Sequence, residues 1–191
     1  MILPLFRRPS RSIDALYGAI VAQARMPVFY AELGVPDTVL GRFDMVLLHV
    51  VLVLRRLRRE GARAGARAGA DAPAERALAQ GLFDRFCRDM DHNLREMGIS
   101  DQGVPRHMQR VGEAFYGRAQ VYEAALSEGA GEGALAQALA RNVYLDTADG
   151  ACAASLARYV RDAVQSLDEQ SLSRGEVRFP TAEFRNLPAT K

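Results

Sequence analysis

The segment MVLLHVVLVL, residues 45–54, constrains the fold more than any other part of the chain. Apart from His49, it is apolar on every face that a helix would present. Such a helix has to be covered on all sides, so it belongs at the centre of a bundle. It is also well short of the ~20 apolar residues that span a bilayer. We therefore expect a soluble domain built around a central helix that runs from Asp37 to about Glu60.

Apolar residues recur with helical spacing through most of the remaining chain, and no stretch shows convincing strand pairing. The expected fold class is therefore all-α, a single bundle domain of about six or seven helices with no significant sheet. Besides the central helix, the spacing predicts helices over 12–25, 74–97, 103–127, 133–146 and 150–168.

Five residues mark the expected helix ends. Asp37 is the expected N-cap of the central helix, and Asp149 that of the last helix. Gly98 is well placed to end the helix before it in a left-handed conformation. Pro27 and Pro36 act as breakers around a short aromatic turn.

Composition divides the chain into three parts. Residues 1–11 form a basic and apolar arm, 12–170 the helical domain, and 171–191 an irregular tail. Within the domain, the repeat GARAGARAGADAP at 61–73 is rich in Ala, Gly and Arg. We expect a mobile connection there, because sequences of low complexity with many glycines rarely pack.

Arginines cluster at the end of the central helix, although the net charge of the chain is only +2. Cations at this end complement the helix dipole and need no partner for that. They also suit contact with ribosomal RNA or with anionic lipid. Each basic residue near an anionic bilayer contributes about 1 kcal/mol of binding free energy. We expect salt-sensitive peripheral contact with an anionic membrane through Arg55, Arg56, Arg58 and Arg59.

The chain lacks the common signatures of catalysis. It has no P-loop, no dinucleotide-binding fingerprint and no G-x-S-x-G, and its two cysteines lie far apart, as in proteins of a reducing compartment. Asp89 and His92 form half of a metal-binding pattern, but a di-iron bundle needs a second pair and further carboxylates. We expect no enzyme activity, no cofactor and no metal. The alternative is a metal- or haem-using helical enzyme built on this half-motif.

The end of the predicted helix 74–97 is crowded with charges. Asp84–Arg88, Arg85–Asp89, Asp91–Arg95 and His92–Glu96 are all spaced i,i+4. Each such pair contributes about 0.2–0.5 kcal/mol in an isolated helix, so the charges can satisfy one another. The same surface also suits recognition by a partner, and spacing does not choose between the two interpretations.

Several dispersed motifs, in order over roughly residues 13–127, resemble the ubiquinol–cytochrome c chaperone family. The pieces are Phe29-Tyr30, Pro36-Asp37, Gly41-Arg42-Phe43-Asp44, His49, Asp91, Leu94-Arg95-Glu96-Met97-Gly98, Asp101 and Phe115-Tyr116-Gly117-Arg118.

The resemblance implies an assembly chaperone instead of an enzyme. Family members help newly made cytochrome b mature into respiratory complex III, and mitochondrial members act with a small partner protein and associate with the ribosome. Mitochondrial members carry long N-terminal extensions, whereas here the family region begins almost at once. We therefore expect a bacterial member at the cytoplasmic face of the inner membrane, with cytochrome b as its partner. A contact with the ribosome or RNA, and an unknown small partner protein, stay open.

A chaperone for transmembrane helices should offer an apolar or aromatic groove rimmed with charge. Phe29 and Tyr116 lie off the regular stripes and are the aromatics expected at the surface, whereas Phe115 and Tyr122 belong to the core. The charged candidates either join helices or meet the partner, and we favour the first. The expected partner-binding residues are Phe29, Tyr30, Arg42, Asp91, Arg95, Glu96, Asp101, Tyr116 and Arg118.

Overall fold

The computed structural model describes residues 11–68, 73–146, 150–172 and 175–180. Over these ranges the chain forms helices and no strand, which confirms the all-α class. No helix among them has the length and hydrophobicity to cross a membrane. The helices are α1 (Arg11–Ala24), α2 (Pro27–Ala31), α3 (Val39–Ala68), α4 (Pro73–Glu96), α5 (Val104–Ala125), α6 (Ala134–Asn142) and α7 (Gly150–Asp168).

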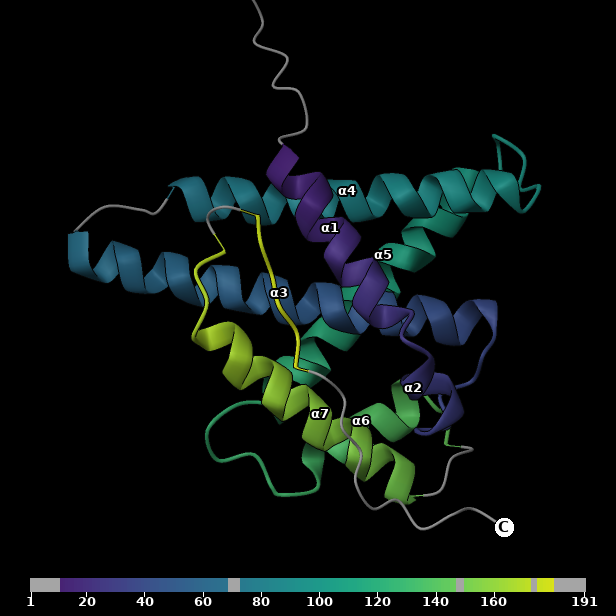
Figure 1. Cartoon of the computed structure of the whole chain (residues 1–191). Helices are drawn as coiled ribbons and strands as arrows, with labels where there is room; N and C mark the ends of the chain where they lie inside the picture. Colours follow the sequence, from purple (N-terminus) through teal and green to yellow (C-terminus); the bar gives the residue numbers. More distant parts are fainter. Residues whose placement is uncertain (1–10, 69–72, 147–149, 173–174, 181–191) are drawn as a thin grey trace, which may run out of the picture.

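Helix α3 is the centre of the domain, as its apolar run predicts. Every residue from Asp44 to Leu57 is buried, because α3 contacts α1, α4, α5 and α7. Helix α4 returns alongside α3, α1 crosses this pair, and α6 and α7 pack together at the bottom of the view in Figure 1. The helix without a polar face has thus become the one that the others cover.

Helix α3 is longer than predicted, so the expectation of a mobile connection over all of 61–73 is wrong. The helix continues to Ala68, and α4 already begins at Pro73. Alanine and arginine are strong helix formers, and here they outweigh the cost of the interspersed glycines. Residues 69–72 lie outside the described part of the chain, as do the arm 1–10, Asp149 and the last residues of the tail.

Local interactions define the start of α3. The N-cap of α3 is Thr38, whose hydroxyl accepts from the Gly41 amide (3.1 Å), and Asp37 pairs with Arg42 instead. The expected cap is therefore one residue too early. A Cβ on Gly41 would lie 2.0 Å from the Pro36 carbonyl, so this turn of the chain requires glycine.

The end of α4 confirms the role expected of Gly98, which has a φ of 83°. Its amide donates to the Arg95 carbonyl (2.9 Å), and the Ile99 amide donates to the Leu94 carbonyl (3.1 Å). These two hydrogen bonds form the Schellman motif that commonly ends a helix. The motif holds the last turn of α4 and the residues that follow it in a defined position.

His49 is fully buried in α3 and connects it to two other helices. Its Nδ1 donates to the Met45 carbonyl (2.8 Å), which can only accept, so Nε2 accepts from the Tyr159 hydroxyl (2.7 Å). That hydroxyl in turn accepts from Gln23 of α1 (3.1 Å). Phe179, from the segment 175–180 that follows α7 without helical structure, packs against the imidazole with ring centroids 5.1 Å apart.

Candidate functional site: an apolar groove beside the end of α4

A groove of about 770 Å³ lies where α1, α3, α4 and α5 meet, beside the last turns of α4. We call it the α4 groove. Its apolar lining is Val21, Val39, Leu40, Phe43, Val46, Met90, Leu94, Met97, Val111 and Ala114. Its polar lining is Arg25, Arg42, Asp89, Asn93, Glu96, His107, Arg110 and Arg118.

Three large apolar side chains of this groove are open to solvent. Val39 is 72% exposed, Met97 55% and Leu40 48%. Single exposed apolar residues are common on any protein, but a cluster of them rimmed by charge marks a surface for binding another molecule. The groove is therefore the strongest candidate site in the described part of the chain.

The sequence predicted a groove with a charged rim and aromatic residues at the surface, and the structure places these aromatic residues in different environments. Phe29 is fully buried, with its ring 4.8 Å from that of Tyr159, so the expectation that it lies at the surface is wrong. Tyr30 is half-buried and donates to the Ala24 carbonyl (2.7 Å). Tyr116 is exposed (64%), as expected, but it does not line the groove. Apart from Phe43, the apolar side chains that line the groove are aliphatic or methionine.

The charged candidates divide between two neighbouring surfaces. Arg42, Glu96 and Arg118 line the α4 groove. Arg95 pairs with Asp91 (2.8 Å) and with Asp101 on an exposed surface around the turn after α4. A contact between either set and a partner stays a prediction, although both lie around the same helix end.

Asp89 and His92 are engaged in separate contacts. Asp89 accepts from the Tyr17 hydroxyl (2.8 Å), and this hydrogen bond ties α4 to α1. Asp89 also pairs with Arg85 of α4 (3.4 Å). His92 pairs with Glu96 (3.1 Å).

Three of the predicted i,i+4 pairs thus form, Arg85–Asp89, Asp91–Arg95 and His92–Glu96. No group of three or more potential ligands gathers around a metal position within the described ranges.

The arginines at the end of α3 do not form the single exposed cluster that was expected. Arg55 and Arg56 are buried, so their predicted contact with an anionic surface is wrong. Arg55 pairs with Glu123 of α5 (3.2 Å), and Arg56 donates to main-chain carbonyls at the end of α7. Arg58 is exposed and Arg59 is half-buried, and a contact between these two and an anionic surface stays a prediction.

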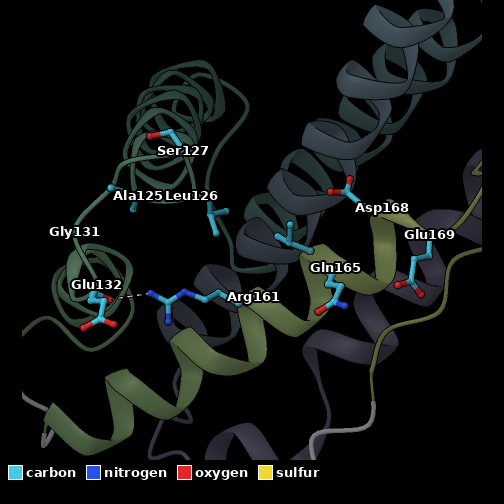
Figure 2. A pocket seen from close by; sticks show the side chains of 11 residues that line it. Ala125, Leu126, Ser127, Gly131, Glu132, Arg161, Gln165, Asp168 and Glu169 are labelled. Atoms are coloured by element: carbon cyan, nitrogen blue, oxygen red, sulfur yellow. Dashed lines mark hydrogen bonds between the residues drawn. The ribbon is translucent and has the colours of Figure 1, made fainter.

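A second hollow, of about 850 Å³, lies between α7 and the segment that follows α5 (Figure 2). Figure 2 shows Arg161 reaching across it, where the guanidinium donates to the Glu132 carbonyl (2.9 Å). At its other edge Asp168 pairs with Arg59 (3.4 Å). None of the predicted partner-binding residues lines this hollow. Its polar groups connect α7 to neighbouring segments, which is a structural role.

A buried ion pair supports the wall of the α4 groove. Asp44 of α3 is fully buried, and its carboxylate lies 2.9 Å from the guanidinium of Arg118 on α5. Burial raises the pKa of Asp44 to about 7, and the nearby Arg118 limits the rise. The Tyr122 hydroxyl is also buried and makes no hydrogen bond to any described group. The pair therefore joins two helices, although burial deprives its carboxylate of water and so opposes the charged form.

The raised pKa of Asp44 predicts a pH dependence of stability. Between the unfolded pKa of 3.8 and the native value of about 7, the native state binds more protons, so stability from this group is lost as pH rises. The Asp44→Asn variant cannot titrate. Relative to the wild type, it should gain about 1–3 kcal/mol of unfolding free energy from pH 5 to pH 8. Urea unfolding of both proteins across this range measures the difference, and a constant difference would contradict the assignment.

Comparison with known proteins agrees with the fold and with the motifs. The family model described as "Ubiquinol-cytochrome C chaperone" matches residues 31–175. The crystal structure of the Cbp3 homolog from Brucella abortus is 40% identical, with a TM-score of 0.78 over 97% of this chain and 100% of that one. No curated protein matches the chain. A family match over most of the sequence, supported by this structural similarity, shows that the chain belongs to the ubiquinol–cytochrome c chaperone family.

Proposed function

We propose that this protein binds newly made cytochrome b in the α4 groove and promotes its assembly into respiratory complex III. The observation that carries the proposal is the cluster of exposed Val39, Leu40 and Met97 in a groove with a charged rim. A client made of apolar transmembrane helices needs such a surface while its own partners are absent. Membership of the chaperone family supplies the class of function.

The proposed mechanism is stoichiometric binding without a catalytic step. Apolar segments of the client are covered in the groove, held while the client matures, and then released. Hydrophobic burial supplies the binding free energy, at about 25 cal/mol for each Å² of apolar surface that is covered. We propose that this takes place at the cytoplasmic face of the inner membrane, where Arg58 and Arg59 are the remaining candidates for contact with anionic lipid.

Neutral polar substitutions in the groove test the proposal. The Leu40→Ser/Met97→Ser double variant should weaken client binding roughly tenfold to hundredfold, because two exposed apolar anchors are lost. In a strain that lacks the wild-type gene, this variant should lower b-type haem absorbance and complex III activity towards the level of the deletion. Co-purification with tagged cytochrome b measures the binding itself.

The matched control is Val121→Ser. Val121 is also exposed and apolar, but it lies on α5 outside the groove. This variant should restore b-type haem and complex III activity like the wild type. Equal activity of the double variant and the control, with both proteins folded by circular dichroism, would show that the groove is not the client site.

A further inference from the structure

The polar lining of the α4 groove carries more positive than negative charge. Four arginines line it, and the acidic residues of the lining are Asp89 and Glu96. Both carboxylates already have partners within the protein. Asp89 interacts with Tyr17 and Arg85, and Glu96 with His92. Neither acid therefore needs a cation from a bound molecule.

Two of the four arginines of the groove have partners as well, and the other two do not. Arg42 pairs with Asp37 (2.5 Å) and Arg118 with Asp44 (2.9 Å). Arg25, directly after α1, and Arg110, on α5, form no ion pair with any acidic residue in the described part of the chain. Both are exposed, so in the free protein water solvates their guanidinium groups. The groove thus presents two available cations from different helical segments around an apolar floor.

A molecule that covers the groove has to replace this water. A cation that loses water without gaining a partner opposes binding, whereas a carboxylate placed beside a guanidinium forms a charge-assisted hydrogen bond. A basic segment would instead bring like charges together, which costs affinity and slows association. An occupant that fits both features therefore has apolar side chains on one face and acidic side chains beside them.

We infer that the α4 groove selects an apolar helical segment that carries acidic side chains, with Arg25 and Arg110 as the residues that bind its carboxylates. The walls of the groove are helices, and helices in such grooves insert apolar residues at positions i, i+3, i+4 and i+7. The inference rests on the proposed function, to which it adds the chemistry of the client segment. It assigns Arg25 and Arg110 to specificity and the apolar lining to affinity.

Two helical peptides test the inference directly. They share leucines at positions i, i+3, i+4 and i+7 and carry either glutamate or lysine at the flanking positions. Fluorescence anisotropy with the full chain at low salt should give a Kd at least about fivefold lower for the glutamate peptide. The preference should shrink as salt is raised, because partly exposed ion pairs are screened. Equal affinity of the two peptides at low salt would overturn the inference.

Charge reversal tests whether Arg25 and Arg110 are the residues that bind the carboxylates of the peptide. The Arg25→Glu/Arg110→Glu variant should reverse the preference, so that the lysine peptide binds more tightly. Arg106→Glu is the matched control, because Arg106 is exposed on α5 one turn away and does not line the groove. It should keep the preference for glutamate. A double reversal that leaves the preference unchanged would overturn the assignment of Arg25 and Arg110.

Two further measurements separate the other outcomes. If the Leu40→Ser/Met97→Ser variant binds both peptides as tightly as the wild type, the groove is not the binding site, and the proposed function fails together with the inference. If this variant weakens both peptides but charge has no effect, only the inference fails. If phosphatidylglycerol vesicles bind the wild type and Arg106→Glu and displace the glutamate peptide from both, but do not bind the Arg25→Glu/Arg110→Glu variant, the two arginines bind lipid phosphate and the inference is overturned.

Discussion

We expect the Arg56→Leu variant to lose about 3 kcal/mol of unfolding free energy. The guanidinium of Arg56 donates through Nε to the Leu167 carbonyl (2.7 Å) and through Nη2 to the Gln170 carbonyl (2.6 Å). The Leu167 carbonyl lies in the last turn of α7, where a helix leaves acceptors without partners, and the Gln170 carbonyl lies two residues beyond the helix end. Leucine can fill part of the space, but each buried carbonyl that loses its donor costs about 1–3 kcal/mol. Chemical denaturation at neutral pH measures the loss.

The matched control for this variant is Arg58→Leu. Arg58 carries the same side chain two positions along α3, but it is exposed and lies 4.0 Å from its acidic neighbour Glu123. Its replacement should change the unfolding free energy by less than about 0.5 kcal/mol. Arg56→Lys should recover only part of the loss, because an ammonium group cannot reproduce the fork of a guanidinium. Similar losses for Arg56→Leu and Arg58→Leu would refute the proposed role of Arg56.

These arginines show where sequence analysis reaches its limit. Basic residues at a helix C-terminus suit the helix dipole, a membrane or a buried contact equally well. Which one applies depends on whether another segment covers that face of the helix. Here the end of α7 reaches Arg56, and Glu123 of α5 reaches Arg55. Neither contact is local in sequence, so periodicity along α3 could not reveal it.

The fold itself was more predictable, because its main determinant is local. An apolar run without a polar face has to be central, and residues from Asp44 to Leu57 are indeed buried. The predicted helix over 150–168 agrees with α7 at both ends. The error at the end of α3 arose because Ala-, Gly- and Arg-rich sequence is compatible with both helix and linker.

The groove could be predicted only in part, for a geometric reason. Met97 lies directly after α4 and continues the apolar stripe on which Leu82 and Phe86 are buried, and such a stripe ordinarily indicates core positions. The stripe extends beyond the elements that cover it, so Met97 remains 55% exposed. Val39 lies at the first turn of α3, before the fully buried stretch begins. Apolar residues at the ends of long helices are therefore the signal that could have located this surface.

Acid should destabilise the protein through His49, and the His49→Gln variant should remove this effect. Burial lowers the pKa of His49 from 6.5 to about 4 in the native state. Between these values the unfolded chain binds more protons, so the stability that His49 contributes is lost as pH falls from about 6.5 to 4. At pH 4.5 the loss should be about 2–3 kcal/mol relative to pH 7.5.

The comparison with His49→Gln isolates this effect, because glutamine does not titrate. At pH 7.5 the wild type should be the more stable protein, since the imidazole packs against Phe29 and Phe179 and accepts from Tyr159. This advantage should shrink by about 2–3 kcal/mol at pH 4.5, as measured by urea unfolding. His92→Gln is the control for the loss of an imidazole outside the core, because His92 is exposed. Parallel profiles for the wild type and His49→Gln would show that His49 is not held neutral in the core.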